Sequence, residues 1–423
     1  MKIPPVKGTR DFYPQDMAVR NWIIDGWKRV SLRNGFEEYD GPIFEYLQMF
    51  QIKSGDEIAE QLFSLKDRGD RDLALRPEIT PTLARMVNQR ISSLPMPIKW
   101  FSVPRLFRAE RPQKGRLREF FQWNVDIIGV DDVLADAETI FCALDYLREA
   151  GLTPDDIVVK ISSRKMLAVV LQAIGVAEGE LDALYAVLDK RNKLADEAFE
   201  EMLQKQLPDT AKRQKVLELM SAETVEEIGS MFGRQEAFDE LVTLMKWLDE
   251  MGVGSYCKFD PGIVRGLAYY TGIVYEIYDK ESELRAIGGG GRYDDLLKQF
   301  GGPAVPATGF GIGDCVLGIL LEEKGLLKPK TKEPDYFVAC VDENYKGSAV
   351  EIAVQLRSRG YVAGFSYKAG KLGKQLKEAS QQNAKKCIII GEEFNNNQLV
   401  VKDMATSEQE TIEVDKFFAE LKP

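Results

Sequence analysis

The chain has 423 residues, of which 44% are hydrophobic and 29% charged, so it has the length for two or three domains and the composition of a globular protein. Its sequence contains no run of about 18 uncharged apolar residues and no apolar signal-peptide core at the N-terminus. We therefore expect no membrane span and a cytoplasmic location. The formal net charge of −11 offers no general attraction for a polyanion, so a nucleic-acid interface must come from local basic patches.

The chain contains no histidine. This excludes a Ser-His-Asp triad, an H-E-x-x-H metal site and an imidazole general base. The cysteines are odd in number and scattered, which argues against a disulfide framework or a cysteine zinc site and favours buried free thiols at Cys142, Cys257, Cys315, Cys340 and Cys387. Catalysis must then use arginine, lysine, carboxylates, backbone dipoles or a cofactor.

In chain order, apolar residues at helical spacing first predict an amphipathic helix over residues 17–34. A strand and turn follow over residues 36–42. Alternating and apolar runs then predict strands of one mixed or antiparallel sheet at 72–75, 98–108, 120–128 and 158–162.

From 172 to 252 the sequence is rich in Leu, Ala, Glu and Lys at helical spacing, which predicts a helical insertion within a domain that spans 1–325. Strand signals return at 255–259 and 267–278. A glycine-rich turn at 287–291 is then expected to lead into a helix at 293–299.

The polar, proline-bearing segment 325–334 predicts a linker. Beyond it, strands alternate with helices over 332–423, which predicts a second, βαβ-type domain with a largely parallel sheet. Its expected strands are 336–341, 361–365, 386–390 and 399–403, and its expected helices are 348–359, 371–382 and 414–421.

The strongest local signal is a basic hairpin that begins at Pro104. Between Pro104 and Arg118 it holds five arginines and one lysine against one acid. The hairpin can present Arg108 and Arg116 to phosphate oxygens, and Phe120 offers a flat face to a base. Alternatively, it is a solvated basic hairpin or a generic RNA-binding loop.

In LALRPEITPTLAR, from Leu73 to Arg85, a strand is expected to end before Glu78, and Thr80 is expected to cap a helix. Glu78 would then face a pocket and hold an ammonium group. The alternative is an ordinary strand–turn–helix.

In IVRGLAYYTGIVYEIYD, Arg265 precedes Tyr269 and Tyr270, and neighbours in a strand point to opposite faces. One tyrosine is thus expected to line a pocket while the other packs in the core, although an amphipathic strand alone would read the same way. The following GGGG lets backbone approach a ligand or another strand closely.

In this order and with these intervals, the four segments resemble the catalytic core of histidyl-tRNA synthetases, which are class II aminoacyl-tRNA synthetases. KGTRDFYP and the strand at Pro42 resemble the family's N-terminal region and its dimer-forming first motif, and the arginine hairpin resembles the second class II motif. RGLAYYTG and GGGGRYDDL resemble the two histidine-specific signatures. KLGKQLKEA and IIIGEEF resemble the anticodon-binding domain, so the resemblance covers essentially the whole chain.

The resemblance implies an α/β protein: an α+β catalytic domain whose antiparallel sheet is flanked by helices, a helical insertion and a C-terminal α/β anticodon-binding domain. It also implies the ligation of L-histidine to tRNA(His), with ATP as substrate, Mg²⁺ and a homodimer. The residues implied in histidine binding are Glu78, Ile79, Thr80, Arg108, Gln122, Asp126, Arg265, Tyr269 and Tyr270. Those implied in ATP binding are Arg108, Glu110, Arg116 and Phe120.

Individual roles follow from the same resemblance. Arg108 would bridge the α-phosphate and the histidine carboxylate, and Arg265 would be the catalytic cation on the transferring phosphoryl group. Asp126 and Tyr270 would read the imidazole ring. On the nucleotide, Glu110 would lie near the adenine, Phe120 would stack on it, and Arg116 would hold the γ-phosphate.

The sequence departs from the family's pattern at the third motif, where Cys315 and Val316 stand in place of a glutamate and an ATP-binding arginine. We expect Arg116 and a neighbour such as Arg292 to compensate. The same departure keeps open a non-catalytic paralogue that serves as the regulatory subunit of ATP phosphoribosyltransferase. The remaining alternatives are a class II synthetase for another amino acid and a non-catalytic nucleic-acid-binding module.

In the last domain, lysines recur at three-residue spacing near one expected helix. They form either a solvated helix face or a stripe that follows the phosphates beside the anticodon stem. The lysines are Lys368, Lys371, Lys374 and Lys377.

Overall fold

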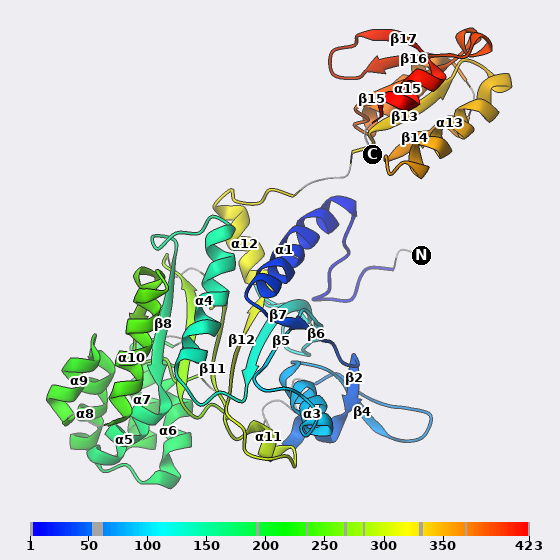
Figure 1. Ribbon diagram of the computed structural model, residues 1–423. Helices are drawn as coiled ribbons and strands as arrows, with labels where there is room; N and C mark the ends of the chain where they lie inside the picture. The colour runs from blue at the N-terminus through cyan, green and yellow to red at the C-terminus, as the bar shows by residue number, and fades with distance from the viewer. Residues whose placement is uncertain are drawn as a thin grey trace. The chain divides into compact units, whose positions relative to one another are not determined.

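The structure is a computed structural model that describes residues 3–52, 62–191, 194–233, 236–265, 269–281, 284–329, 333–368 and 370–421. It forms two compact units, Met1–Pro329 and Lys330–Pro423, which are described separately below (Figure 1). Among the helices of these residues, none is long and apolar enough to cross a membrane.

The first unit is built on one large sheet, whose strands lie in the order β1-β5-β7-β12-β11-β10-β8-β9, with β6 also paired to β7. The central pairs are antiparallel, and only the outer pairs β1–β5 and β8–β9 are parallel within the described chain. This confirms the expected antiparallel sheet, but the strand predicted over 72–75 as part of it belongs to a separate small sheet. The strands are β1 Glu37–Glu38, β5 Ile98–Ser102, β6 Arg105–Phe107, β7 Glu119–Ile128, β8 Ile157–Ser163, β9 Cys257–Phe259, β10 Ile273–Asp279, β11 Gly288–Arg292 and β12 Ala307–Gly313.

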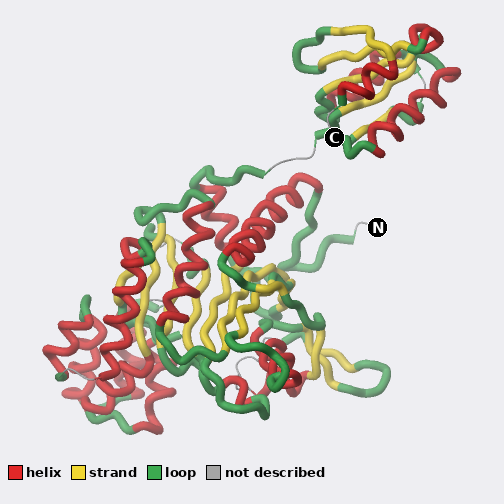
Figure 2. The backbone as a smooth tube through the Cα atoms, viewed as in Figure 1, coloured by secondary structure: helices red, strands yellow, loops and turns green. Residues whose placement is uncertain are grey.

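Helices cover both faces of this sheet (Figure 2). One face packs on α1 (Pro14–Arg33), α4 (Leu134–Glu149) and α12 (Asp314–Glu323). The aromatic centre of that core is Trp27 stacked on Trp123, with ring centroids 6.0 Å apart. The other face carries α3 (Thr80–Arg90) and α11 (Leu296–Gln299) over a separate apolar cluster.

The four glycines from Gly288 to Gly291 form strand β11, between β10 and β12, and not the predicted turn. Pairing on both sides supplies the backbone hydrogen bonds that hold a sequence of low strand propensity extended. The strand expected over 267–278 begins only at Ile273; of its earlier positions, 267 and 268 lie outside the described residues.

The first unit also contains a small three-stranded sheet, whose strands lie in the order β2-β4-β3. Its strands are β2 Phe44–Tyr46, β3 Ser64–Lys66 and β4 Asp72–Leu75, all antiparallel. Thr80 does not cap α3 as predicted. It is the first residue of the helix, and the cap position belongs to Ile79, whose apolar side chain is buried in the core.

Helices occupy most of the chain between β8 and β9 (green in Figure 1). Ser163 starts this region by accepting a hydrogen bond from the Met166 amide at 3.2 Å. The helices are α5 Arg164–Ile174, α6 Leu181–Leu188, α7 Asp196–Gln206, α8 Thr210–Ser221, α9 Val225–Phe232 and α10 Glu236–Glu250, with short 3₁₀ turns at Glu178–Glu180 and Gly254–Tyr256.

The second unit is a five-stranded sheet, within the described residues, in the order β14-β13-β15-β16-β17. Only β13 pairs in parallel, with β14 and β15; the other pairs are antiparallel, so the predicted largely parallel sheet is wrong for one half. The reason is that short connections join β15 to β16 and β16 to β17. In the second of these, the Asp403 carboxylate accepts from the amides of Ala405 and Thr406, each at 2.9 Å. A short turn can join only antiparallel strands.

The sequence also missed strand β17, because its exposed edge QETIE carries little apolar signal. The unit's other elements follow the predicted alternation. They are β13 Tyr336–Cys340, α13 Lys346–Ser358, β14 Ala363–Phe365, α14 Leu372–Gln381, β15 Lys386–Ile390, β16 Gln398–Asp403, β17 Gln409–Glu413 and α15 Val414–Glu420, with 3₁₀ turns at Glu343–Tyr345 and Glu392–Asn396.

Candidate active site

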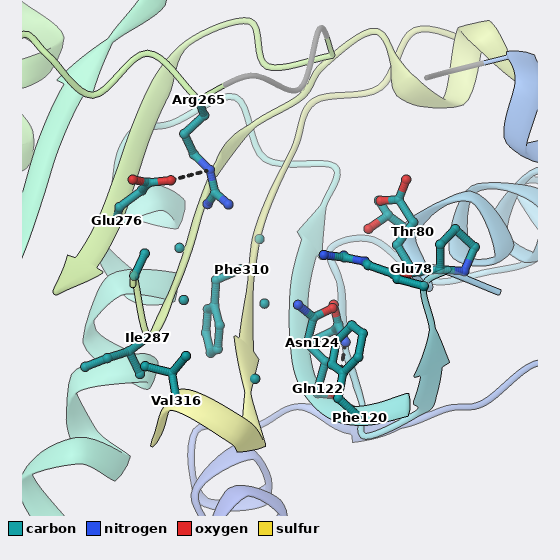
Figure 3. Close-up of a pocket in the computed structure, with 18 of the residues that line it drawn as sticks. Glu78, Thr80, Phe120, Gln122, Asn124, Arg265, Glu276, Ile287, Phe310 and Val316 are labelled. Carbon is teal, nitrogen blue, oxygen red and sulfur yellow. Dashed lines mark hydrogen bonds and ion pairs between the residues drawn. The ribbon is translucent and has the colours of Figure 1, made fainter. Parts of the chain in front are cut away.

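A pocket of about 440 Å³ opens on the face of the large sheet that carries α3 (Figure 3). Its walls come from β7, from β10 to β12 and from the loops that precede α3 and β10. Segments far apart in sequence thus meet in one place, including the basic hairpin and the tyrosine pair.

Glycines form the floor of the pocket. A Cβ atom at position 309 would lie 2.4 Å from the Asp126 carboxylate, and one at position 311 would lie 2.8 Å from the Gln122 amide. In β11, a Cβ atom at Gly289 would lie 2.5 Å from the Arg265 guanidinium. Any larger residue at these positions would displace a polar side chain of the pocket.

Strand β7 contributes one wall through its alternation. Phe120, Gln122, Asn124 and Asp126 line the pocket, while Trp123 lies on the opposite face in the core with α1. Asn124, which the sequence analysis did not single out, donates to the Gln122 carbonyl at 3.1 Å. Because alternate residues of a strand point to the same face, the position of Asn124 follows once Phe120, Gln122 and Asp126 are placed in the pocket.

Aromatic side chains surround Asp126 at one end of the pocket. The Tyr293 hydroxyl donates a hydrogen bond to the Asp126 carboxylate. The rings of Tyr269 and Tyr270 have centroids 4.6 Å apart, and Tyr269 meets Tyr293 edge-on at 5.8 Å. Burial and the Asp126 charge raise the pKa of Tyr293, so the phenol stays a hydrogen-bond donor.

Both Tyr269 and Tyr270 line the pocket, so the prediction that one of them would pack away from it is wrong. The two residues precede β10 and are not part of a strand, so the alternation of a strand does not apply to them. Tyr293 was missed as a site residue, although it stands within the motif GGGGRYDDL.

Arg265 is held in an uncommon backbone conformation, with φ of 50°. The buried Arg164 fixes it by donating to the Arg265 carbonyl at 2.6 Å and to the Val264 carbonyl at 3.0 Å. The Arg265 guanidinium lies 3.6 Å from Glu276 and 5.3 Å from the centre of the Tyr270 ring. Figure 3 shows the Arg265–Glu276 pair across the pocket from Glu78 and Phe120.

The basic hairpin brings two further arginines to the pocket. Arg108 donates to the Pro77 carbonyl at 3.1 Å and lies over the Phe120 ring, 5.1 Å from its centre. Burial lowers the pKa of Arg108, and the nearby Glu78 opposes this effect. Arg116 is the third pocket arginine, and its guanidinium contacts Glu110.

Asp314 at the start of α12 fastens the hairpin to the N-terminal segment. Its carboxylate accepts from Arg10 at 2.6 Å and from the Phe121 amide at 2.9 Å. Val316 lies against the turn of the hairpin, where a Cβ atom on Gly115 would be 2.9 Å away. The altered third motif is therefore part of the pocket wall, with apolar surface where a cation was expected.

The pocket brings together most of the residues predicted from the sequence. Two predicted residues are not among those that line it. The Ile79 side chain is buried in the core at the start of α3, and the Glu110 carboxylate contacts the Arg116 guanidinium outside the pocket lining. The predicted residues that line the pocket are Glu78, Thr80, Arg108, Arg116, Phe120, Gln122, Asp126, Arg265, Tyr269 and Tyr270.

Further lining residues carried no usable sequence signal. Glu276 stands in β10 opposite Gly289, and Asp189 follows α6 in the helical region. Cys315 also lines the pocket, but burial raises the pKa of its thiol to about 12. Of the other thiols, only Cys257 is half-exposed rather than buried.

Arg292 does not compensate for the third motif as predicted. Its guanidinium donates to Asp136 through Nε at 3.0 Å, and to the carbonyls of Val130 and Asp132, each at 3.0 Å. The side chain is buried behind the sheet and is not among the pocket residues. Its charge is therefore used to neutralise Asp136.

Comparison with known proteins agrees with this arrangement. A family model described as histidyl-tRNA synthetase matches residues 8–313, and one described as an anticodon binding domain matches residues 335–423. The chloroplastic/mitochondrial histidine–tRNA ligase of Arabidopsis thaliana is 40% identical over 410 residues, which are 96% of this chain and 84% of that protein. The histidine–tRNA ligase of Opitutus terrae is 40% identical over 94% of this chain and 93% of that protein.

A solved structure is also similar. The crystal structure of histidyl-tRNA synthetase from Nostoc sp. PCC 7120 matches with a TM-score of 0.82 and covers 99% of both chains. At 23% sequence identity, this likeness shows the shared fold.

We expect Arg292→Leu to destabilise the protein by about 3–5 kcal/mol, because it leaves the buried Asp136 carboxylate without its cation. Thermal unfolding of the full chain measures the effect. The exposed Arg148→Leu on α4 is the matched control, with a change within about 0.5 kcal/mol. The double variant Arg292→Leu/Asp136→Leu should recover much of the loss. Equal losses of stability in Arg292→Leu and in the control Arg148→Leu would contradict the assignment.

Proposed function

Because the chain belongs to the histidyl-tRNA synthetase family, we propose that it is a histidine–tRNA ligase. It activates L-histidine with ATP to histidyl-adenylate and then transfers the histidyl group to the 3′ end of tRNA(His), giving AMP and pyrophosphate. The observation that carries this proposal is a single pocket with a carboxylate–tyrosine end and an arginine end.

The carboxylate–tyrosine end suits a histidine side chain. Asp126 is an acceptor for an imidazole N–H, and Tyr293 keeps that carboxylate oriented. Tyr269 and Tyr270 would enclose the imidazole ring beside it. A site built to pair a buried ring nitrogen discriminates against amino acids that cannot donate a hydrogen bond to Asp126.

The polar groups of the substrate backbone would be bound nearby. Glu78, Thr80 and Gln122 lie on the wall that follows the aromatic end and would hold the ammonium group. Arg108 would bind the carboxylate and the α-phosphate together. Ile79 supports this wall from the core beneath α3.

The nucleotide would lie along the basic hairpin. Phe120 presents a ring for the adenine to stack on, and Arg116 is the cation for the γ-phosphate. Glu110 contacts Arg116 rather than the pocket, so we assign it to holding that arginine in place.

The first step needs no general base, because the histidine carboxylate is ionised already. Its oxygen attacks the α-phosphorus of ATP, the bond to the bridging oxygen breaks, and pyrophosphate leaves with that electron pair. Arg108 and Arg265 would stabilise the charge that develops, each by about 3 kcal/mol, a typical value for one preorganised donor. In the second step a ribose hydroxyl of the tRNA attacks the mixed anhydride and AMP leaves.

Mg²⁺ would enter with ATP. This ion binds proteins through one or two carboxylates together with substrate phosphates. Glu276 is a pocket carboxylate beside the proposed phosphate cation Arg265, so it fits one such ligand. When bound, the metal would neutralise phosphate charge.

The altered third motif favours a second candidate, the regulatory subunit of ATP phosphoribosyltransferase. The arginines of the pocket and the 40% identity to two histidine–tRNA ligases favour the enzyme. We place the reaction in the cytoplasm, where cell fractionation would find the protein with the translation machinery.

The second unit would bind the anticodon region of the tRNA. Lys371 and Lys374 are exposed at the start of α14, Lys377 is exposed midway along it, and Lys368 lies just before it. Cations at a helix N-terminus oppose the helix dipole, so their gathering there does not serve the helix itself. It suits contact with a phosphate backbone.

The small sheet of the first unit would contribute to a homodimer interface. Tyr46 and Leu65 are about half exposed, and both pair with Leu73, so they form one apolar row across three strands. Ile43 and Phe44 add to this exposed surface. Exposed apolar patches of this kind are typical of protein interfaces.

The function is tested by ATP–pyrophosphate exchange with each amino acid in turn, where we expect exchange with histidine alone. Gly309→Ala should raise the KM for histidine by about tenfold or more, because its Cβ displaces Asp126. Gly229→Ala on α9 is the control, since a Cβ there meets only ordinary contacts at 3.8 Å. Folded protein without histidine-dependent exchange would overturn the enzyme and leave the regulatory candidate.

Replacing Lys371, Lys374 and Lys377 together with alanine should raise the KM for tRNA by about tenfold. The dependence of charging on salt should become shallower, by about 0.7–0.9 in log–log slope per lost phosphate contact. Exchange with histidine should stay unchanged. The control replaces Lys346, Lys385 and Lys416, and a loss equal to that of the test variant would count against this surface.

Sedimentation of the full chain should give about twice the mass of 47.7 kDa. Tyr46→Glu should shift the protein to monomers, because a charge would be buried in the apolar row. Val354→Glu, at an exposed valine of α13, is the control and should remain dimeric. A monomeric wild-type chain would end the proposal.

A further inference from the structure

The phosphate end of the pocket has less positive charge available than its arginines suggest. Arg265 faces Glu276 at 3.6 Å, and Arg116 contacts Glu110. Arg108 lies within electrostatic reach of Glu78. Each described pocket arginine thus has a carboxylate beside it, whereas a triphosphate brings several negative charges into the same space.

Helix α12 faces the pocket through Val316, which carries no charge. Its side chain is 7% exposed and lies against the turn at Gly115. Figure 3 shows Val316 beside Ile287, with Phe310 above them, so this end of the pocket has apolar surface. Such a surface leaves the phosphates without a cation from α12.

Strand register brings one more arginine to this end. Gly288 pairs with Ile312, and the Ile287 carbonyl accepts from the Gly313 amide at 3.3 Å. If the antiparallel register is continued, Arg285 stands opposite Cys315, one residue from Val316. Ala286 and Ile287, which follow Arg285, both line the pocket.

Arg285 is exposed and, within the described part of the chain, makes no hydrogen bond or ion pair. It is nevertheless within electrostatic reach of Arg116. Burial, followed by the positive charges of Arg285 and Arg108, lowers the pKa of Arg116 to about 10. Two guanidinium groups that repel each other are both stabilised when an anion binds between them.

We propose that Arg285 binds the terminal phosphates of ATP together with Arg116, and supplies from the segment before strand β11 the cation that α12 lacks. This rests on the proposed function and names a residue of the same site. The guanidinium would approach the β- and γ-phosphates from the segment before β11, opposite the arginines of the basic hairpin. Its long, exposed side chain leaves it free to close on the nucleotide after entry.

The test is calorimetric binding of ATP, pyrophosphate and AMP to the full chain. Arg285→Ala should weaken ATP and pyrophosphate by about tenfold or more, as for loss of a charge-assisted hydrogen bond. AMP lacks the two terminal phosphates, so its Kd should change less than twofold. Arg285→Lys should restore part of the affinity for ATP, because it restores the charge without the planar fork.

Arg148→Ala, which removes an exposed arginine of α4, is the matched control for net charge and should leave all three affinities unchanged. In the exchange assay, Arg285→Ala should raise the KM for ATP but not that for histidine. Equal losses for AMP and pyrophosphate, or ATP binding no weaker than in the control, would overturn the proposal. A wild-type chain that binds ATP but exchanges nothing with histidine would instead overturn the function and leave the role of Arg285 to be judged by binding.

Discussion

The pocket depends on strands that carry no side chains where the substrates must lie. Gly309 and Gly311 in β12, and Gly289 in β11, leave room above the sheet that any Cβ atom would fill. On the opposite face of the sheet, the same strands also leave no space for additional Cβ atoms. A Cβ at Gly290 would lie 2.8 Å from both Phe310 and the Tyr275 hydroxyl. The run of four glycines therefore serves the core on one side and the pocket on the other.

This arrangement divides stability and chemistry between the two faces of one sheet. Strand β7 shows the division residue by residue, since Trp123 anchors the helical face while Gln122 and Asp126 serve the pocket. The chemistry then relies on fixed charges rather than on proton transfer. Burial raises the pKa values of Tyr269, Tyr270 and Tyr293, which keeps these phenols neutral, and arginines stay charged throughout the physiological range. A chain without histidine can therefore carry this pocket.

Sequence patterns predicted the elements whose side chains alternate or recur with a clear period. Strand β7, helix α1 and the alternation of the second unit are of this kind, whereas Asp126 and Gln122 were indicated only by the family resemblance. The patterns failed where neighbours decide the structure. Gly288–Gly291 is a strand only because β10 and β12 pair with it, and Arg292 is buried only because Asp136 lies behind the sheet. Asp189 reaches the pocket from a distant helix, for which local sequence offers no signal.

The parallel pairing of β8 with β9 has a consequence for the helices that connect them. Val159 pairs with Cys257, so the chain leaves the end of β8 and must return to the beginning of its neighbour. A tight turn cannot make that return, because parallel strands need a crossover of a dozen or more residues. Natural or engineered shortening of α5–α10 could therefore proceed down to a single crossover helix, but complete excision would detach the edge strand β9 from the sheet.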